Sequence, residues 1–404
     1  MKKANLSLPG RIRDEKVSIL VDKIVDFSFM GEKLKFCLSH ALFSSFDVDV
    51  GTKLLLKTVA QRINFEKIVK TKDIGAGAGI IGICLKKKFP HIDVTFTDRD
   101  MLALDFTKLN NELNGIGDYR VSGELGIRRA DIKYDFIVSN IPAKIGDKGL
   151  EDFIKKMILS VAADGICAVV VIKPLTTQIR EILAGAGAAL TFEEMGKAHW
   201  VVHFKAPENL DGIKVPADEI APYIRDNIAQ KDFGFSYKLK TVFNLPDFDT
   251  MGYQSELLLD LLKNEKPSGA CLFWNPGQGR VPVLAHKIFP GKISRYILAG
   301  RDLLQLQISR DNLIANGVQA ENISVKHVSL VGEIMEPVQN YIIIPDVIPM
   351  TDGYDITLKD LRHANIFISD KSTNIFRLLE KQNAYRVVKR IKKNGFTGIY
   401  LRRH

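Results

Sequence analysis

A repeat with a period of 202 residues, as from Phe46 to Phe248, constrains this chain more than any other feature of its sequence. Identical residues recur at that spacing at turn glycines, apolar helix positions and loop asparagines, which are the residues that define a strand-helix-strand unit. Chance would not readily place identities at equivalent points of one such pattern. We therefore predict two copies of one domain. The repeated residues are Phe46-Asp47 with Phe248-Asp249, Leu55-Leu56 with Leu257-Leu258, Gly75 and Gly77 with Gly277 and Gly279, Asp100, Leu102 and Leu104 with Asp302, Leu304 and Leu306, Asn110 with Asn312, and Asn114-Gly115 with Asn316-Gly317.

The predicted boundary lies between the two copies in a segment rich in proline and charge. We expect a first domain over 1–206, a connection over 207–234 and a second domain over 235–404. The connection contains Pro207, Pro216 and Pro222, and we expect a short helix in it at about 217–230.

Strands and helices alternate along the first copy. Apolar strands separated by amphipathic helices predict an α/β fold, a doubly wound and mostly parallel sheet, and the last two strands predict a closing antiparallel hairpin. The second copy is expected to share this fold. The expected strands are 67–72, 92–97, 134–138, 166–172, 189–193 and 200–205, and the expected helices are 80–88, 100–114, 150–162 and 176–183.

A glycine-rich loop, Asp73-Ile74-Gly75-Ala76-Gly77-Ala78-Gly79, follows the first core strand and opens a helix. Residues 77–82 also satisfy the GxGxxG pattern of dinucleotide sites, which alone is weak support. The flanking acids favour S-adenosylmethionine instead. Asp73 would repel a pyrophosphate but suits an ammonium group, and Asp98 at the end of the second strand can accept both ribose hydroxyls. The alternatives are a solvated loop acid for Asp73 and a helix cap for Asp98.

From about Leu34 to Lys205 the sequence resembles the methyltransferase small-domain family, and most closely its bacterial rRNA guanine-N2 methyltransferases of the RsmC and RlmG type. Those enzymes are tandem duplications with one degenerate copy, usually the first, whereas here the first copy has the intact loop. The residues that carry the resemblance are Phe43-Ser44, Asp49-Val50-Gly51-Thr52, Leu54-Leu55-Leu56, the loop from Asp73 to Gly79, Asp98, Asn114-Gly115 and Tyr134-Asp135-Phe136-Ile137-Val138-Ser139-Asn140.

The resemblance implies further residues at the site. It places Phe43, Gly51 and Thr52 beside the cofactor, although this stretch also reads as a hydrophobic turn with Thr52 as a helix N-cap. It places Glu124 near the adenine ring, although an exposed loop acid fits equally well.

The family's catalytic tetrapeptide is Asn-Pro-Pro-aromatic, and this chain has Asn140-Ile141-Pro142-Ala143. In the family the Asn side chain and the following carbonyl accept the hydrogens of an exocyclic amine, and the aromatic residue stacks on the flipped base. Asn140 and Pro142 are therefore the candidate catalytic residues. Ala143 cannot stack, and His199 or Trp200 could take that role. The alternative for Asn140 to Pro142 is a strand-ending turn.

The second copy has lost the acids of the site. Asn275-Pro276-Gly277-Gln278-Gly279 replaces the loop, Gly300 stands in place of Asp98, and Pro345-Asp346-Val347-Ile348-Pro349 replaces the tetrapeptide. We expect a non-catalytic copy that serves packing or substrate docking. Its basic end could contact RNA phosphates or form a solvated strand and helix end. The basic residues are Lys389, Arg390, Lys392, Lys393, Arg402 and Arg403, with Phe396 and Tyr400 among them.

The composition of the chain indicates which partners and which cellular compartment to expect. The net charge of +10 suits a polyanion such as ribosomal RNA and implies no DNA in particular, although many proteins are mildly basic. No stretch approaches a membrane helix or a signal peptide, and four scattered cysteines predict buried free thiols, no metal site and a reducing cytoplasm. We expect an S-adenosylmethionine-dependent methyltransferase acting on guanine N2 of ribosomal RNA. The alternatives are a protein or small-molecule methyltransferase and a catalytically impaired binding protein.

Overall fold

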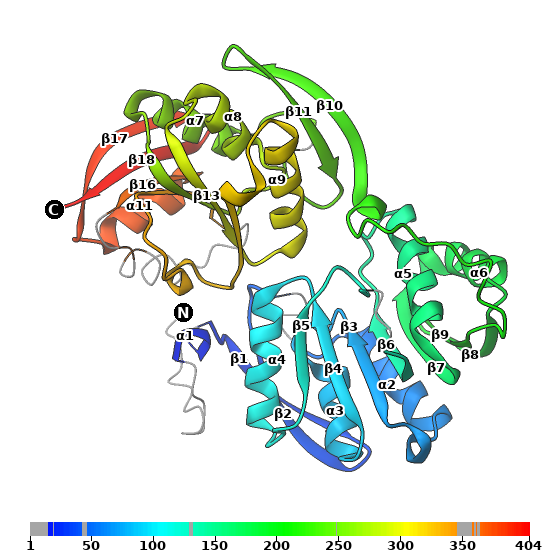
Figure 1. Ribbon diagram of the computed structural model, residues 1–404. Helices are drawn as coiled ribbons and strands as arrows, with labels where there is room; N and C mark the ends of the chain where they lie inside the picture. The colour runs from blue at the N-terminus through cyan, green and yellow to red at the C-terminus, as the bar shows by residue number, and fades with distance from the viewer. Residues whose placement is uncertain are drawn as a thin grey trace. The chain divides into compact units, whose positions relative to one another are not determined.

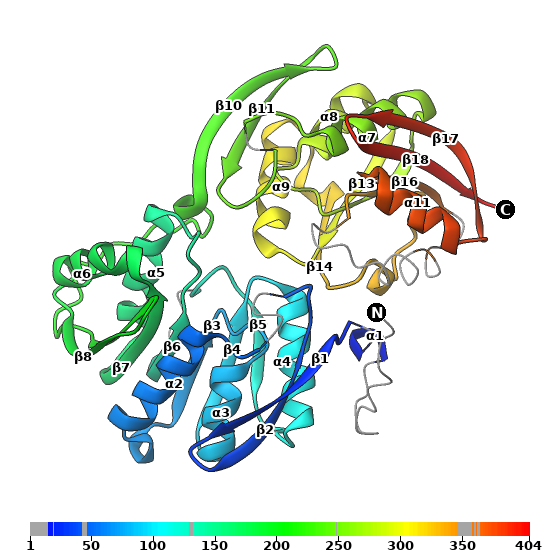
Figure 2. The same cartoon turned by 180° about the vertical axis from the view of Figure 1, so that it is seen from behind.

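The computed structural model describes residues 15–18, 20–42, 47–128, 132–247, 249–345, 358, 361 and 364–404. The chain divides into two compact units, Met1–Tyr223 and Ile224–His404, and each is an α/β unit built around its own sheet (Figures 1 and 2). The two-copy prediction from the repeat is therefore confirmed at the level of the fold.

The first unit is built on a seven-stranded sheet of order β5-β4-β3-β6-β7-β9-β8. Strands β3 to β7 run parallel, while β9 pairs antiparallel with both β7 and β8. This confirms the parallel sheet with a closing hairpin. The strands are β3 (Lys70–Ile74), β4 (Asp93–Asp98), β5 (Arg120–Gly123), β6 (Tyr134–Asn140), β7 (Val161–Ile172), β8 (Ala189–Met195) and β9 (His199–Lys205).

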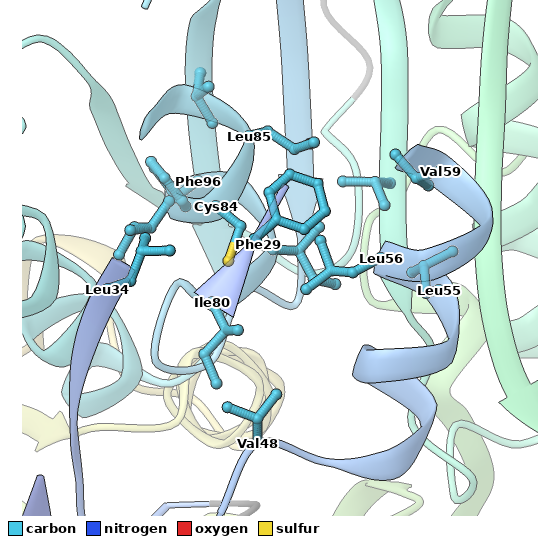
Figure 3. Packing of buried hydrophobic residues seen from close by; sticks show 14 of the residues in the cluster. Phe29, Leu34, Val48, Leu55, Leu56, Val59, Ile80, Cys84, Leu85 and Phe96 are labelled. Atoms are coloured by element: carbon cyan, nitrogen blue, oxygen red, sulfur yellow. The ribbon is translucent and has the colours of Figure 1, made fainter. Parts of the chain in front are cut away.

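Helices pack on both faces of this sheet, as the strand-helix alternation predicts. Apolar residues of α2 and α3 pack against Phe96 of β4 in the core (Figure 3). Phe29 and Leu34, which come from a segment before the sheet, belong to the same apolar cluster. The helices are α1 (Glu15–Ser18), α2 (Val50–Arg62), α3 (Ile80–Lys88), α4 (Met101–Leu113), α5 (Asp147–Ser160) and α6 (Thr176–Gly185), with short 3-10 turns at Phe65–Lys67, Lys173–Leu175 and Ala221–Tyr223.

A hairpin of β1 (Lys23–Phe29) and β2 (Glu32–Leu38) precedes the sheet and was not expected from the sequence pattern. The repeated asparagines of α4 hold it in place. Asn110 bonds both backbone groups of Cys37, at 2.7 and 3.1 Å, and Asn114 bonds both backbone groups of Lys35, at 3.0 and 2.8 Å. These asparagines are therefore repeated because they join a hairpin to a helix.

The second unit repeats this plan with sheet order β14-β13-β12-β15-β16-β18-β17. Its own hairpin is clamped by Asn312 and Asn316, which bond the backbone of Lys240 and Lys238. The elements are β10 (Ile224–Asp232), β11 (Phe235–Val242), α7 (Tyr253–Glu265), β12 (Gly269–Trp274), α8 (Arg280–Ile288), β13 (Ile293–Gly300), α9 (Leu303–Ala315), β14 (Ile323–His327), β15 (Asn340–Ile343), β16 (Asn365–Lys371), α11 (Ser372–Lys381), β17 (Tyr385–Lys393) and β18 (Phe396–Arg403), with 3-10 turns at Ala320–Asn322 and Val331–Glu333.

The predicted helix at 217–230 is wrong. Residues 221–223 form a single 3-10 turn, and Ile224–Asp232 is the first strand of the second unit's hairpin. The end of the expected connection thus belongs to the second unit, because its backbone pairs antiparallel with β11.

The four cysteines are buried free thiols, as predicted. Within the described ranges, no helix has the length and apolar character needed to cross a membrane. The same residues contain no group of three or more His, Cys, Asp or Glu that could hold a metal ion.

Candidate active site

The glycine loop joins β3 to α3 at the carboxyl edge of the sheet. Gly75, Gly77 and Gly79 all have positive φ, at 66°, 57° and 79°, which L side chains rarely adopt. A Cβ built at Gly79 would lie 2.9 Å from Ile83 Cδ1, whereas one at Gly75 or Gly77 meets no described atom within 4 Å. Gly79 is thus required for packing, and Gly75 and Gly77 leave an open face beside the loop.

Asp73 lies beneath this loop and is 1% exposed, so the solvated loop acid considered from the sequence is wrong. Its Oδ2 accepts the Gly82 backbone N–H at 2.8 Å. Its buried Oδ1 has no hydrogen-bond partner among the described residues. Burial raises the pKa of Asp73 to about 7, with the Gly82 amide acting against the shift and the Asp98 charge adding to it. A buried acceptor oxygen of this kind is suited to a cationic or protic ligand group.

Asp98 ends β4 opposite the loop. Its Oδ2 accepts the Gly77 N–H at 3.0 Å and its Oδ1 accepts the Asp100 N–H at 2.9 Å. The helix-cap alternative is wrong, since Asp100 is the N-cap of α4 and accepts from Leu102. Burial, followed by the neighbouring Asp100 charge, raises the pKa of Asp98 to about 6. Each oxygen retains a lone pair with which to accept a ligand hydroxyl.

Asn140 stands at the end of β6, and its amide nitrogen donates to Asp49 Oδ2 and Thr52 Oγ1, both at 3.1 Å. A carboxylate can only accept, so Asp49 fixes the orientation of this amide. The Asn140 carbonyl oxygen accepts no hydrogen bond from any described residue and remains available. The alternative interpretation of Thr52 as a helix N-cap is wrong, because Asp49 caps α2 and accepts from the Thr52 N–H at 3.2 Å.

Gly51 packs between Asp49 and His199. A Cβ at Gly51 would lie 2.9 Å from Asp49 Oδ2 and 3.0 Å from His199 Cδ2. His199 therefore borders the Asn140 corner, and its Nδ1 is buried without a partner among the described residues. Trp200 is fully buried and donates to Glu193, so it cannot stack on a base. Phe43 falls outside the described residues.

The remaining tetrapeptide residues differ in exposure. Ile141 is buried and its N–H donates to the Val170 carbonyl at 3.0 Å, a bond that a proline at this position would forfeit. Pro142 and Ala143 are exposed at the rim. The departure at Ile141 therefore preserves a bond between β6 and β7.

Glu124 is not an exposed acid. It pairs with Lys72 at 2.7 Å, and the two side chains are only 12% and 3% exposed. Its backbone N–H donates to the Asp98 carbonyl, which places this ion pair next to Asp98. Sequence reasoning missed Lys72 and Asp49. Asp49 could have been found, because an Asp three residues before Thr52 is a common N-cap signal.

Comparison with known proteins identifies the segment that contains these residues. Residues 33–184 match the family model of the methyltransferase small domain.

This segment is similar to the methyltransferase small-domain family.

Two curated relatives are both named ribosomal RNA small subunit methyltransferase C. The protein from Mannheimia succiniciproducens is 37% identical over 116 residues, which is 28% of this chain and 32% of that protein. The protein from Haemophilus influenzae is 36% identical over 104 residues, which is 25% of this chain and 29% of that protein. The chain thus aligns with about a third of the length of these relatives.

The fold likeness extends over both units. The T. thermophilus 16S rRNA N2 methyltransferase RsmC, solved in complex with AdoMet and guanosine, superposes with a TM-score of 0.67. The superposition covers 95% of this chain and 98% of that chain at 13% sequence identity. The first unit, which contains this segment, is therefore followed by a second unit of the same fold.

The second unit keeps the backbone of the first unit's glycine loop without its acids. Gly277 and Gly279, at φ 59° and 82°, occupy the places of Gly77 and Gly79, so the register at the loop is 200 residues and the 202-residue pairing of these glycines is wrong. Phe273 consequently stands in place of Asp73, and Asn275 in place of Gly75.

In this second loop a neutral amide takes the place of one carboxylate of the first loop. Gln305 Oε1 accepts the Gly277 N–H at 3.2 Å, the role that Asp98 has at Gly77, and Gln305 Nε2 donates to Asn275 Oδ1 at 3.2 Å. Gly300 ends β13 where Asp98 ends β4, as expected. Residues 346–349 of the degenerate tetrapeptide lie outside the described residues.

Proposed function

We propose that this chain is an S-adenosylmethionine-dependent methyltransferase that methylates the N2 amine of a guanine in ribosomal RNA, using its first unit. The observation that carries the proposal is the Asn140 amide, held by Asp49 and Thr52 at 3.1 Å with its carbonyl left available, at the carboxyl edge that also contains Asp73 and Asp98. The methyltransferase small domain match over 33–184 and the names of the curated relatives support the same activity.

The residues of the first loop fit the cofactor. Asp98 would accept the ribose hydroxyls, and the unpartnered Oδ1 of Asp73 would accept the ammonium group directly or through water. The open faces of Gly75 and Gly77 would let the ligand approach the backbone. Gly51 and Thr52 would border the same ligand. The proposal requires no metal.

Asn140 supplies positioning for the acceptor. Its carbonyl oxygen and the following backbone carbonyl would accept the amine hydrogens, so that the nitrogen lone pair points at the methyl group. When bound, S-adenosylmethionine would supply an electrophilic methyl group to this amine, with its sulfur as the leaving group. The extra proton on nitrogen then leaves to solvent. Pro142 would limit the freedom of the loop that presents Asn140.

In this proposal the second unit binds no cofactor, because Phe273 and Gly300 offer it no carboxylate. Its role is packing or RNA docking. A reducing cytoplasm is the compartment that the four free thiols favour.

The exposed Ala143 favours a second candidate, a methyltransferase for a protein or small-molecule amine. No aromatic side chain stands at this position to stack on a flipped base, and loss of such stacking costs about 1–3 kcal/mol per base. A catalytically impaired protein that only binds the cofactor or RNA is the remaining alternative.

Two measurements separate these candidates. Calorimetry with S-adenosylmethionine should show one bound cofactor per chain, and absence of binding would remove both enzymatic candidates. Transfer of tritium from labelled cofactor should go to rRNA from a deletion strain and not to protein or metabolite fractions.

The Asn140→Ala variant tests the acceptor site. It should bind the cofactor normally and lose methyl transfer by about a hundredfold or more, as for other preorganised polar groups that act on the reacting atoms. Asn209→Ala, at an exposed loop asparagine, is the matched control and should retain full activity. Full transfer by Asn140→Ala would refute the assigned role.

A further inference from the structure

The last strand of each sheet differs in charge between the two units. Strand β17 contains five cations in nine residues, Arg386, Lys389, Arg390, Lys392 and Lys393. Strand β8, at the same edge of the first sheet, has the sequence ALTFEEM, with two acids and no cation. Because the two strands occupy equivalent places in one fold, the cations of β17 are not a requirement of that fold.

One group of these cations is neutralised within the unit. Lys393 pairs with Glu256 of α7, and this hydrogen bond raises the pKa of Lys393. Lys389 and Lys393 also lie close enough to Asp260 of α7 for their charges to lower its pKa, against the larger effect of burial. These two lysines therefore have acidic partners on the helix that packs beside them.

Two further cations, Arg390 and Lys392, lie against an exposed aromatic ring on α11. Phe376 is 40% exposed, the Arg390 guanidinium carbon lies 5.5 Å from its ring centroid, and Lys392 Nζ lies 4.9 Å from it. Among the described residues, neither Arg390 nor Lys392 makes an ion pair. Helix α11 and strand β17 lie side by side at the C-terminal edge of the unit (Figures 1 and 2).

At the equivalent edge of the first unit, the charged side chains of the helix and the strand pair with each other. Arg180, the fifth residue of α6 as Phe376 is of α11, donates to Glu193 of β8 at 2.6 Å and lies 5.2 Å from the Trp200 ring. There the helix provides the cation and the strand provides the acid. In the second unit the ring is on the helix and the cations are on the strand, without an acid between them.

We propose that Phe376, Arg390 and Lys392, the edge platform, bind single-stranded RNA, so that the second unit docks the substrate of the first. Bases stack on aromatic rings and guanidinium planes, while phosphates contact the cations, and this combination is typical of single-strand binding. An acidic protein would be attracted by the charges but would not need the exposed ring. The platform rests on the proposed function for its RNA partner.

The test uses the full chain and a fluorescein-labelled single-stranded RNA, with affinity measured by fluorescence anisotropy over a range of salt. Phe376→Ala should weaken binding about 5- to 100-fold, the loss of stacking for one base. The double change Arg390→Gln with Lys392→Gln should lower the slope of log affinity against log salt by about 0.7 for each phosphate that the protein no longer neutralises.

Two control variants test whether the loss of RNA affinity is specific to the platform residues. Lys393→Gln removes a cation of the same strand that is already paired with Glu256, and should change RNA affinity less than twofold. Glu380→Gln removes an exposed acid one helical turn from Phe376 and should strengthen binding. Each variant should keep the parent's melting temperature, because these side chains are exposed.

The outcomes separate the platform from the catalytic assignment. If Phe376→Ala and the double variant bind RNA as the parent does, or if polyglutamate competes with RNA as well as unlabelled RNA does, the platform is refuted. If the parent binds no S-adenosylmethionine but the platform variants bind RNA more weakly than the parent, the proposed function fails and the platform stands. In the active chain, the platform variants should raise KM for RNA and leave kcat unchanged.

Discussion

The glycine loops of the two units have nearly the same backbone and different chemistry. The positive φ angles of Gly77 and Gly79 are matched within a few degrees by Gly277 and Gly279. In the first loop carboxylates bond the backbone, whereas in the second a glutamine amide does. The comparison teaches that the turn depends on residues that permit its dihedral angles, while ligand binding depends on separate residues that the fold does not require.

One pair of substitutions shows how the acid was lost without cost to the helix. In the first unit the Gly82 N–H donates to Asp73. At the same place in the second unit, Pro282 has no N–H and Phe273 has no acceptor. Pro282 is the third residue of α8, where the backbone N–H has no partner within the helix, so the proline is tolerated. Because the N–H donor and the carboxylate acceptor are both absent, neither is left buried without a hydrogen-bond partner.

The largest expected effect comes from removing the acid that the second unit lacks. Asp98→Ala should raise the Kd for S-adenosylmethionine by about two to four orders of magnitude, because each hydrogen bond to a charged group contributes about 1.5–3 kcal/mol. Isothermal calorimetry measures this. Asp100→Ala is the matched control, since it removes the helix cap two residues away and should cost about 1 kcal/mol of stability while binding persists. Equal binding by Asp98→Ala would mean that the ribose acid has been misassigned.

The next effect is a pH dependence confined to the first unit. The folded pKa of Asp73, about 7, exceeds the ordinary value of 3.8, so the folded state binds the proton more tightly. Stability from this group is complete below about pH 4 and falls as pH rises toward 7, by a few kcal/mol in order of magnitude. Cofactor affinity should move the opposite way, rising by up to about thirtyfold between pH 5.5 and 8 as the carboxylate ionises for the ammonium group.

Calorimetric melting and binding at several pH values test this pair of trends. Asp73→Asn should remove the part of both trends that centres near pH 7 and leave the smaller part from Asp98, whose pKa is about 6. The second unit has Phe273 at this position, so its unfolding should lack the Asp73 contribution in the parent as well as in the variant. A wild-type affinity that is flat across this window would contradict the assignment of Asp73 to the ammonium group.

The smallest expected effect concerns the helix beside Asn140. Gly51 is the second residue of α2, and Gln254 is the second residue of α7. Gly51→Ala would force Asp49 or His199 to move, because the new Cβ would approach both within 3.0 Å. We expect methyl transfer to fall about tenfold through misplacement of Asn140, with the melting temperature unchanged. Ala60→Gly, on the same helix, serves as the comparison that alters stability and spares transfer.

Much of the fold could be predicted because its signals are local. Helix α3 has the bounds that the apolar pattern predicts, and α4 begins and ends within a residue of its expected limits at Asp100 and Asn114. The β1–β2 hairpin could not be predicted in this way. Its position depends on side-chain amides of α4 that lie more than 70 residues away in the chain.

By itself the sequence determined the two copies, the strand-helix order, the glycine loop and the identities of the acids beside it, since each follows from spacing along the chain. Only the tertiary structure decided how those groups act. Burial under the loop raises the pKa of Asp73, and Asp49 orients Asn140 across 91 residues. The edge platform of the second unit arises because α11 lies against β17. Protonation and orientation depend on neighbours in space, which periodicity along a chain does not record.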